Sequence, residues 1–293
     1  MGEFLYGTSS WSHAGWNGVF YPAGMKPGDY LTHYATQFRT VEADVTYYRV
    51  PDRRLVEGWD RKTPEGFVLS AKFPRTVVHG GEAEKPDPAK LLVPDAVGED
   101  VRRFLDAMSL LGPKCGPLVL QFPYFNRQAF PSPEPFLERL DEFLAGLPPG
   151  FRYAVEVRNR AWIAEPLLSL LRRRCVGLVL VDLAYMPHPA DLAAKLDLVT
   201  ADFVYARLIG DRKAVEAKTQ TFDRLVLDQS ERLKRWADLL AVLASRVPLS
   251  LTYANNHYAG HGPATIRELA ALVDRAKAQA APPRAGDPAP IPP

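Results

Sequence analysis

Short apolar runs recur along the whole chain and alternate with longer segments whose apolar residues have helical spacing. This alternation favours parallel βαβ units over a sandwich or a helical bundle. Since eight parallel strands close into a barrel, the pattern predicts an α/β fold, a single (β/α)8 TIM barrel with outer helices. The predicted strands are Leu5–Ser9, Thr40–Tyr47, Gly66–Lys72, Pro117–Phe122, Arg152–Val157, Val176–Leu183, Phe203–Leu208 and Leu249–Tyr253.

Chain length fits one such barrel, because these barrels use about 250 residues in one domain. We assign residues 1–279 of the 293 to the barrel. Residues 280–293 are rich in proline and poor in large apolar side chains, so they are predicted to form a flexible tail with no part in the chemistry.

Charge and cysteine content narrow the function classes. The chain has 36 Lys and Arg against 34 Asp and Glu, a formal net charge of +2, so a long nucleic-acid track is not expected. Cys115 and Cys175 form no CxxC motif and no secretory leader precedes them, which predicts reduced thiols in a cytoplasmic protein. No apolar run approaches the roughly 20 residues that span a bilayer, so no membrane contact is expected.

Polar side chains end several of the apolar strands. The most informative stretch is Val155-Glu156-Val157-Arg158, where a carboxylate and a guanidinium two residues apart share one face. Barrel enzymes keep their chemistry at this end of the strands, so Glu156 is a candidate general base or hydroxyl anchor and Arg158 a candidate ligand for a carboxylate or phosphate. The alternative is a pair that only fixes the loop. Other strands end in the same way, at Lys72, Gln121, Asp182, Arg207 and Asn255.

The second and third strands add further ionisable candidates. Glu42 and Asp44 are predicted to share a face, where they form either a structural ion-pair network or part of a catalytic site. Lys72 ends an apolar strand, and an ion pair with Glu42 is the favoured interpretation. A proton-transfer or Schiff-base role is the alternative. Asp182 is taken as a further group that handles charge or protons.

The last strand leads into a glycine-bearing turn that opens a helix. Such a turn offers backbone N–H groups to a phosphate, with Arg207 as countercharge and Asn255 and Asn256 orienting the substrate. Gly260 marks this turn, although glycines at bends often serve only the turn itself.

Aromatic residues follow several strands, among them Trp11 and Tyr48, and rings at a barrel mouth can stack a sugar or a base. Many such rings simply pack under loops. His79 and His188 lie in or near loops and are expected to be exposed. No HExxH motif appears, but Glu42, Glu156, Asp182 and His257 come from separate strand ends and form an alternative divalent-metal set.

Several local motifs together resemble one family, the domain of unknown function 72 (YecE-like). They are Gly7-Thr8-Ser9-Ser10-Trp11, Phe20-Tyr21-Pro22, Val41-Glu42, Thr46-Tyr47-Tyr48-Arg49, Thr63-Pro64-Glu65-Gly66-Phe67, Glu156-Val157-Arg158, Tyr205-Ala206-Arg207 and Asn255-Asn256-His257. The likeness spans roughly residues 4–275 and implies a TIM barrel, but no established activity.

Two positions depart from the family's pattern: Asp44 stands where an Asn is usual, and Ile209 where a His is expected. Because of these two departures, the resemblance gives no support for a histidine role on the seventh strand. They also add one negative charge at the mouth, which favours a metal or cationic ligand slightly.

The leading expectation is an enzyme that acts on a small, polar, anionic ligand such as a sugar phosphate or nucleotide at the C-terminal face of the barrel. The first alternative is a divalent-metal-dependent hydrolase or isomerase, similar to the xylose-isomerase and endonuclease barrels. The second is a barrel that binds a ligand or nucleic acid without turnover.

Overall fold

The structure is a computed structural model that describes residues 2–280. Eight parallel strands form one sheet in the order β1-β8-β7-β6-β5-β4-β3-β2. All eight predicted strands are present, with ends that differ by a few residues. They are β1 Glu3–Thr8, β2 Thr40–Ala43, β3 Val68–Lys72, β4 Cys115–Gln121, β5 Tyr153–Glu156, β6 Gly177–Leu183, β7 Phe203–Gly210 and β8 Leu249–Ala254.

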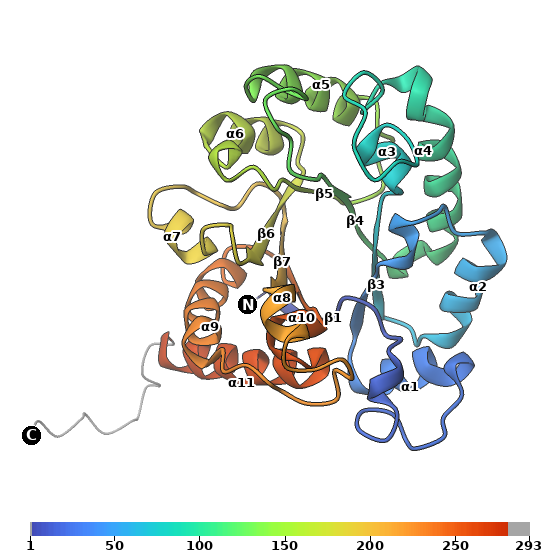
Figure 1. The fold of residues 1–293 in the computed structure, drawn as a ribbon, viewed down its shortest axis with the longest axis vertical. Coiled ribbons are helices and arrows are strands. Elements are labelled where there is room, and N and C mark those ends of the chain that lie inside the picture. The colour runs from blue at the N-terminus through green and yellow to red at the C-terminus, as the bar shows by residue number, and fades with distance from the viewer. Residues whose placement is uncertain (1, 281–293) are drawn as a thin grey trace, which may run out of the picture.

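Helices form a ring outside the strands (Figure 1). The α-helices are α1 Tyr30–Gln37, α2 Arg53–Lys62, α3 Arg75–His79, α4 Pro94–Met108, α5 Glu134–Ala145, α6 Glu165–Arg173, α7 Pro189–Ala193, α8 Arg212–Glu216, α9 Ser230–Ala244, α10 Asn256–Ala259 and α11 Gly262–Ala280. Short 3-10 helices cover Ala14–Trp16, Pro27–Asp29, Val45–Tyr47, Ser109–Lys114 and Arg160–Trp162. None of the helices within residues 2–280 is long and apolar enough to cross a membrane.

Local sequence signals set the helix starts. Asp52 accepts a hydrogen bond from the N–H of Leu55 at 2.8 Å and so caps α2, as its position predicts. The predicted strand over 40–47 is shorter than expected because the chain turns into a 3-10 helix at Val45. α11 continues through Ala280, and the rest of the predicted tail, 281–293, lies outside the described residues.

The barrel closes between β1 and β2 through fewer backbone contacts than at its other seams. Here the ladder is reduced to a bridge between Ser9 and Glu42, with the Ser10 N–H donating to the Glu42 carbonyl at 2.8 Å. The Tyr34 hydroxyl spans the seam, since it accepts from the Thr8 N–H at 2.8 Å and donates to the Thr40 carbonyl at 3.2 Å. Side-chain hydrogen bonding therefore completes the cylinder.

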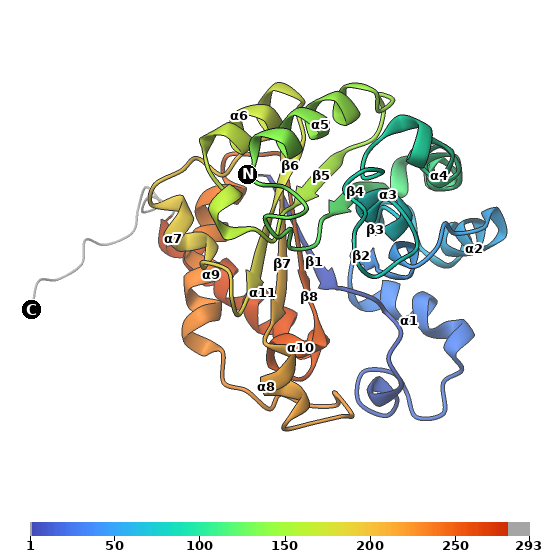
Figure 2. The same cartoon turned by 45° about the horizontal axis from the view of Figure 1, so that its top comes forward.

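An apolar layer fills the barrel interior and a polar layer lies above it. The apolar layer comes from alternate positions of six strands: Leu5, Val119, Ala154, Val179, Phe203, Tyr205, Leu251 and Tyr253. Two residues further along their strands stand Gln121, Glu156 and Arg207. Because side chains alternate between faces of a strand, these polar groups point into the same interior, toward the carboxyl ends. In Figure 2 the arrowheads of β6, β7, β8 and β1 point toward the end of the barrel that carries α8 and α10.

Candidate functional site

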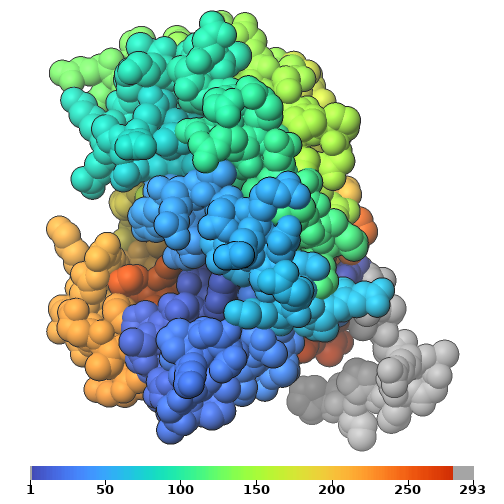
Figure 3. Space-filling model, turned by 90° about the vertical axis from the view of Figure 1, so that its right-hand side faces the viewer, coloured from blue at the N-terminus to red at the C-terminus, as the bar shows by residue number. Residues whose placement is uncertain are grey.

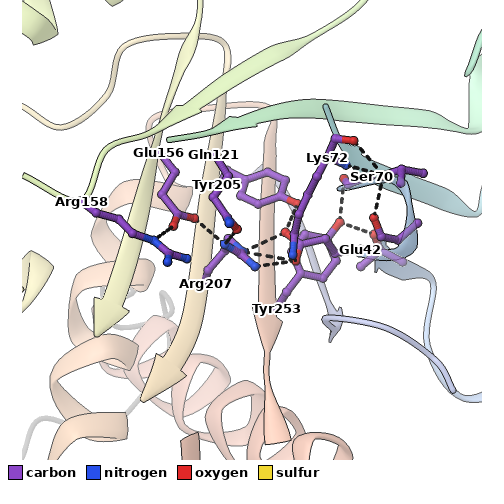
Figure 4. A network of polar contacts seen from close by, with 12 residues as sticks. Glu42, Ser70, Lys72, Gln121, Glu156, Arg158, Tyr205, Arg207 and Tyr253 are labelled. Carbon is purple, nitrogen blue, oxygen red and sulfur yellow. Dashed lines mark hydrogen bonds and ion pairs between the residues drawn. The ribbon is translucent and has the colours of Figure 1, made fainter. Parts of the chain in front are cut away.

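A buried cluster of charged side chains occupies the carboxyl end of the barrel interior (Figure 4). Glu42 and Glu156 are completely buried, and Arg207 and Lys72 expose 2% and 7% of their surface. They come from four strands, β2, β5, β7 and β3, so the fold brings together residues that are far apart in sequence. Burying an ionised group costs free energy unless an opposite charge is paired with it. Nearly all the ionised groups of this cluster have such a partner.

Arg207 stands at the centre of the cluster. Its Nη2 donates to Oε1 of Glu42 at 2.9 Å, its Nε lies 2.9 Å from Oε2 of the same carboxylate, and its Nη1 donates to Oε1 of Gln121 at 2.7 Å. Nη1 also donates to Glu156. The pairing with Glu42 and Glu156 outweighs burial and raises the pKa of Arg207 further. The guanidinium of Arg207 is therefore hydrogen-bonded to protein partners in this structure, and its role as an anion ligand stays a prediction.

Glu42 is held ionised by its neighbours. Burial raises the pKa of its carboxyl group, but Arg207 and Lys72 overcome that effect and lower the pKa to about 2. The Tyr205 hydroxyl donates to Oε2 of Glu42 at 2.8 Å. With both oxygens occupied, Glu42 acts as the anchor of the ion-pair network, as one of its two predicted interpretations has it.

Glu156 and Arg158 form the predicted pair on β5. Arg158 Nε donates to Oε1 of Glu156 at 3.1 Å, while Oε2 accepts from Arg207. Burial raises the pKa of Glu156, yet Arg207 and Arg158 together bring it below its ordinary value. Arg158 is 27% exposed, and within residues 2–280 its two terminal nitrogens have no hydrogen-bond partner. Arg158 therefore keeps two NH2 groups for a ligand.

Lys72 pairs with Glu42 as predicted, but loosely. Its Nζ lies 3.5 Å from Oε1 of Glu42 and makes no hydrogen bond within the described part of the chain. Burial and the positive charge of Arg207 lower the pKa of Lys72, while Glu42, Asp44 and Glu156 oppose the shift. Asp44 lies just past the end of β2, at the start of the 3-10 helix, and is half-buried instead of forming a second rung inside the barrel.

The rim above Glu156 carries a second group of polar residues. The Tyr47 hydroxyl lies 2.8 Å from Nε2 of His79, which is 5% exposed and so more buried than its loop position predicts. Burial raises the pKa of Tyr47, and the positive charges of Arg158 and Arg75 oppose that rise. The Arg75 Nε is buried without a hydrogen-bond partner among the described residues. Tyr48, 71% exposed, packs edge to face on Tyr47.

The mouth is open to solvent. Figure 3 shows a hollow bordered by the orange segment around α8 and by the blue and teal segments of the N-terminal half. Within the cluster Arg158 is the most exposed side chain, at 27% against 9% for Lys72 and 3% for Arg207.

Asp182 is not part of the cluster, contrary to its predicted place. It accepts from Nε1 of Trp236 at 2.8 Å and from the Tyr258 hydroxyl at 2.9 Å, and it pairs with Arg232. These partners belong to α9 and α10, so the side chain points out of the barrel, while Val181 packs with other interior residues. His188, 4% exposed and not exposed as expected, lies 3.9 Å from the same carboxylate.

The turn after β8 uses its polar groups internally. Asn255 caps α10 by accepting from the His257 N–H at 2.9 Å. Asn256 accepts from the Gly262 N–H at 2.8 Å and from Nε1 of Trp16 at 3.2 Å. Gly260 has φ of 113° and ends α10, and its N–H donates to the Asn256 carbonyl at 2.7 Å. The polar groups that were predicted to bind a phosphate at this turn therefore already make hydrogen bonds to other protein groups.

Two other predicted candidates lie away from the cluster. Trp11 packs edge to face on Trp59 of α2, with ring centroids 5.6 Å apart, and it lines an outer groove between α1 and α2. His257 lies 3.2 Å from Glu216 of α8. The alternative metal ligands Glu42, Glu156, Asp182 and His257 thus do not converge, and residues 2–280 contain no group of three or more His, Cys, Asp or Glu placed to hold a metal ion.

Two functional candidates were missed by sequence reasoning. Tyr205 precedes Arg207 by two residues, so strand alternation alone places it on the same inward face. Arg75 begins a short helix after β3, and nothing in its local sequence marks it as a rim residue.

The chain matches, over residues 5–289, the family described as "Protein of unknown function DUF72". It is 32% identical over 182 residues to the "UPF0759 protein YecE" of Escherichia coli K12, an alignment that covers 60% of this chain and 58% of that protein. The chain thus spans less than two thirds of the length of this curated relative.

Two crystal structures of DUF72 family proteins have a similar fold. The protein from Thermotoga maritima is 26% identical with a TM-score of 0.69, and the similarity covers 92% of this chain and 99% of that one. The protein from Enterococcus faecalis is 18% identical with a TM-score of 0.67, covering 93% of this chain and 96% of that one. The predicted barrel and the predicted family resemblance are both confirmed.

Proposed function

Because the chain belongs to the DUF72 family, whose description assigns no activity, we propose its function from the site itself. The protein is an enzyme that binds a small, polar, anionic ligand at the carboxyl end of the barrel, with Arg158 as the principal ligand of the anion. The observation that carries the proposal is the pair of unpaired terminal nitrogens of Arg158, which together with Arg207 and Lys72 makes three cations beside two carboxylates.

The charge balance supports an anion. While Lys72 is protonated, Arg207, Arg158 and Lys72 face Glu42 and Glu156, which leaves one positive charge in excess. Asp44, half-buried at the rim, offsets part of this charge and Arg75 adds to it. A planar guanidinium with both NH2 groups available binds a carboxylate or phosphate in bidentate fashion.

The buried network supports catalysis over a purely structural role. Replacing buried ion pairs by apolar residues is often neutral or stabilising, so such a network contributes little to fold stability that a simpler core would lack. Groups with perturbed pKa values concentrate at functional sites. Here Glu42 and Glu156 hold Arg207, and Glu156 also orients Arg158.

A thermal-shift experiment tests the proposal. Inorganic phosphate, ribose 5-phosphate or AMP at about 100 times its Kd is expected to stabilise the protein by about 2.7 kcal/mol. Arg158→Ala removes this shift. The matched control is Arg152→Ala, which removes an arginine preceding the same strand whose surface pair with Asp202 lies 3.2 Å apart.

Three results would count against the proposal. A shift that survives Arg158→Ala places the anion elsewhere, and stabilisation by divalent metal alone favours the metal-dependent alternative. Stabilisation by a single-stranded oligonucleotide but not by small phosphates favours the non-catalytic binding barrel.

We also propose a cytoplasmic location. Cys115 and Cys175 are both free thiols, which suits a reducing compartment. Fractionation of cells that express the full chain tests this proposal.

A further inference from the structure

Lys72 is the one cation of the buried cluster that lacks a close partner. The alternation Val68, Ser70, Lys72 along β3 directs its side chain into the barrel interior, where 9% of it is exposed. In Figure 4 it extends from β3 toward Glu42 and Arg207. Its Nζ lies 3.5 Å from Glu42 and makes no hydrogen bond within residues 2–280.

Competition explains this loose pairing. Glu42 already accepts from the Tyr205 hydroxyl at 2.8 Å and from Arg207 Nη2 at 2.9 Å, with Arg207 Nε 2.9 Å from Oε2. A carboxylate with these three donors has little left for an ammonium. The second carboxylate, Glu156, is occupied by Arg207 and Arg158.

Proton chemistry then singles out Lys72. The cluster holds more cations than carboxylates, and a guanidinium keeps its proton under all ordinary conditions. An ammonium does not, and a lysine that is desolvated beside another cation is the usual form of an activated amine nucleophile. Burial and Arg207 lower the pKa of Lys72 in this way, against the opposing charges of Glu42, Asp44 and Glu156.

We propose that Lys72 is a catalytic nucleophile that forms a Schiff base with an aldehyde or ketone carrying a phosphate or carboxylate. This inference rests on the proposed function, because Arg158 holds the anionic group while the carbonyl carbon meets Nζ. The lone pair of Nζ adds to that carbon and the C=O π electrons move to oxygen. Nζ then loses its two hydrogens, which leave with that oxygen as water, and a C=N bond remains. The step needs no oxidant, reductant or further reactant.

Reductive trapping tests the inference on the intact protein. The full chain is incubated with glyceraldehyde 3-phosphate and cyanoborohydride, and peptide mass spectrometry follows the rate of labelling at each lysine. Lys90, whose side chain is 64% exposed in a surface pair with Asp87, serves as the internal control. Because burial and Arg207 lower the pKa of Lys72 and Arg158 holds the phosphate beside it, Lys72 is expected to label faster than Lys90 at neutral pH.

Two comparisons sharpen the test. The ratio of labelling at Lys72 to labelling at Lys90 should be smaller with glyceraldehyde that carries no phosphate. Arg158→Ala should lower the ratio for the phosphorylated aldehyde to that same level. In Lys72→Arg and Lys72→Met, labelling at Lys90 should continue at the wild-type rate while the fast-labelled peptide disappears. The comparison within the wild-type protein holds even if a variant fails to fold.

The outcomes separate the two proposals. If phosphate stabilises the protein through Arg158 but Lys72 labels no faster than Lys90, the Schiff-base inference is wrong and anion binding stands. If the Lys72 to Lys90 labelling ratio is high and equal for the phosphorylated and the plain aldehyde, the amine is activated but Arg158 is not the anion ligand, and the proposed function fails.

Discussion

At the scale of single residues, Arg207 stabilises the ionised form of both buried carboxylates. It contacts Glu42 and Glu156 with 3% of its side chain exposed. Arg207→Met removes the main partner that the two buried carboxylates share. Breaking a buried pair in this way lowers the free energy of unfolding by about 3–5 kcal/mol. We expect a loss of this size in the free energy of unfolding measured in urea. Arg152→Ala, which breaks an exposed pair, should cost less than about 1 kcal/mol, and equal losses for the two variants would contradict the network.

The depressed pKa of Glu42 makes a second prediction at this scale, on acid stability. Its carboxyl has a pKa of about 2 in the folded protein against 4.5 for the ordinary group. Since the unfolded chain binds the proton more tightly, the stabilisation is complete above pH 4.5 and is lost as pH falls toward 2. The difference amounts to about 3 kcal/mol. Urea unfolding from pH 6 down to 3 should show about 2 kcal/mol of this loss in the wild type. Glu42→Gln should flatten the slope although it lowers stability at pH 6, and an unchanged slope would assign the acid sensitivity to other carboxylates.

At the scale of elements, the seam between β1 and β2 depends on one hydroxyl. Tyr34→Phe removes the acceptor of the buried Thr8 N–H and the donor to Thr40, which is expected to cost about 1–3 kcal/mol. Gly7 tightens the same seam, because a Cβ there would lie 2.2 Å from the Thr40 carbonyl oxygen. Tyr6→Phe is a matched control, since both tyrosine rings pack on Phe38 and the Tyr6 hydroxyl has no hydrogen bond among the described residues. Urea unfolding of the two variants measures the difference, and equal stabilities would mean that the backbone bridge alone closes the barrel.

The strands could be predicted because their apolar runs are short and bounded by turn residues. The side of the sheet to which some residues point could not be predicted. Glu156 and Arg158 share a face by simple alternation, and their pairing follows from that. β6 is buried on both sides, so its sequence does not show whether Val181 or Asp182 points inward, and a shift of one residue exchanges the faces. The partners that fix Asp182 outward, Trp236 and Tyr258, lie more than fifty positions away.

The partners of Arg207 could not be predicted from local sequence either. Its strand end predicts a charged residue at the barrel mouth, and the structure has one there. Whether protein groups pair with that charge depends on how closely residues of β2 and β5 approach it across the barrel. The residue pattern of a single strand does not contain this information. Packing of the closed sheet, not local sequence, leaves the two terminal nitrogens of Arg158 without a hydrogen-bond partner among residues 2–280.

At the scale of the whole molecule, the protein has both exposed and buried ion pairs, and salt is expected to weaken only the exposed ones. Surface pairs such as Arg102–Glu99, with both side chains 67% exposed, are screened by ions, whereas the cluster around Arg207 is enclosed. In about 1 M NaCl the Debye length falls to about 3 Å, so the partly exposed Arg158 should lose most of its attraction for phosphate. The buried network should remain, and the fall in unfolding free energy between pH 6 and pH 3 that comes from Glu42 should persist in high salt. Thermal shifts with phosphate and urea unfolding, each at low and high NaCl, measure the two effects on the same protein. If salt abolished the acid dependence together with the phosphate shift, the cluster would be open to solvent ions and Arg207 would be available to ligands after all.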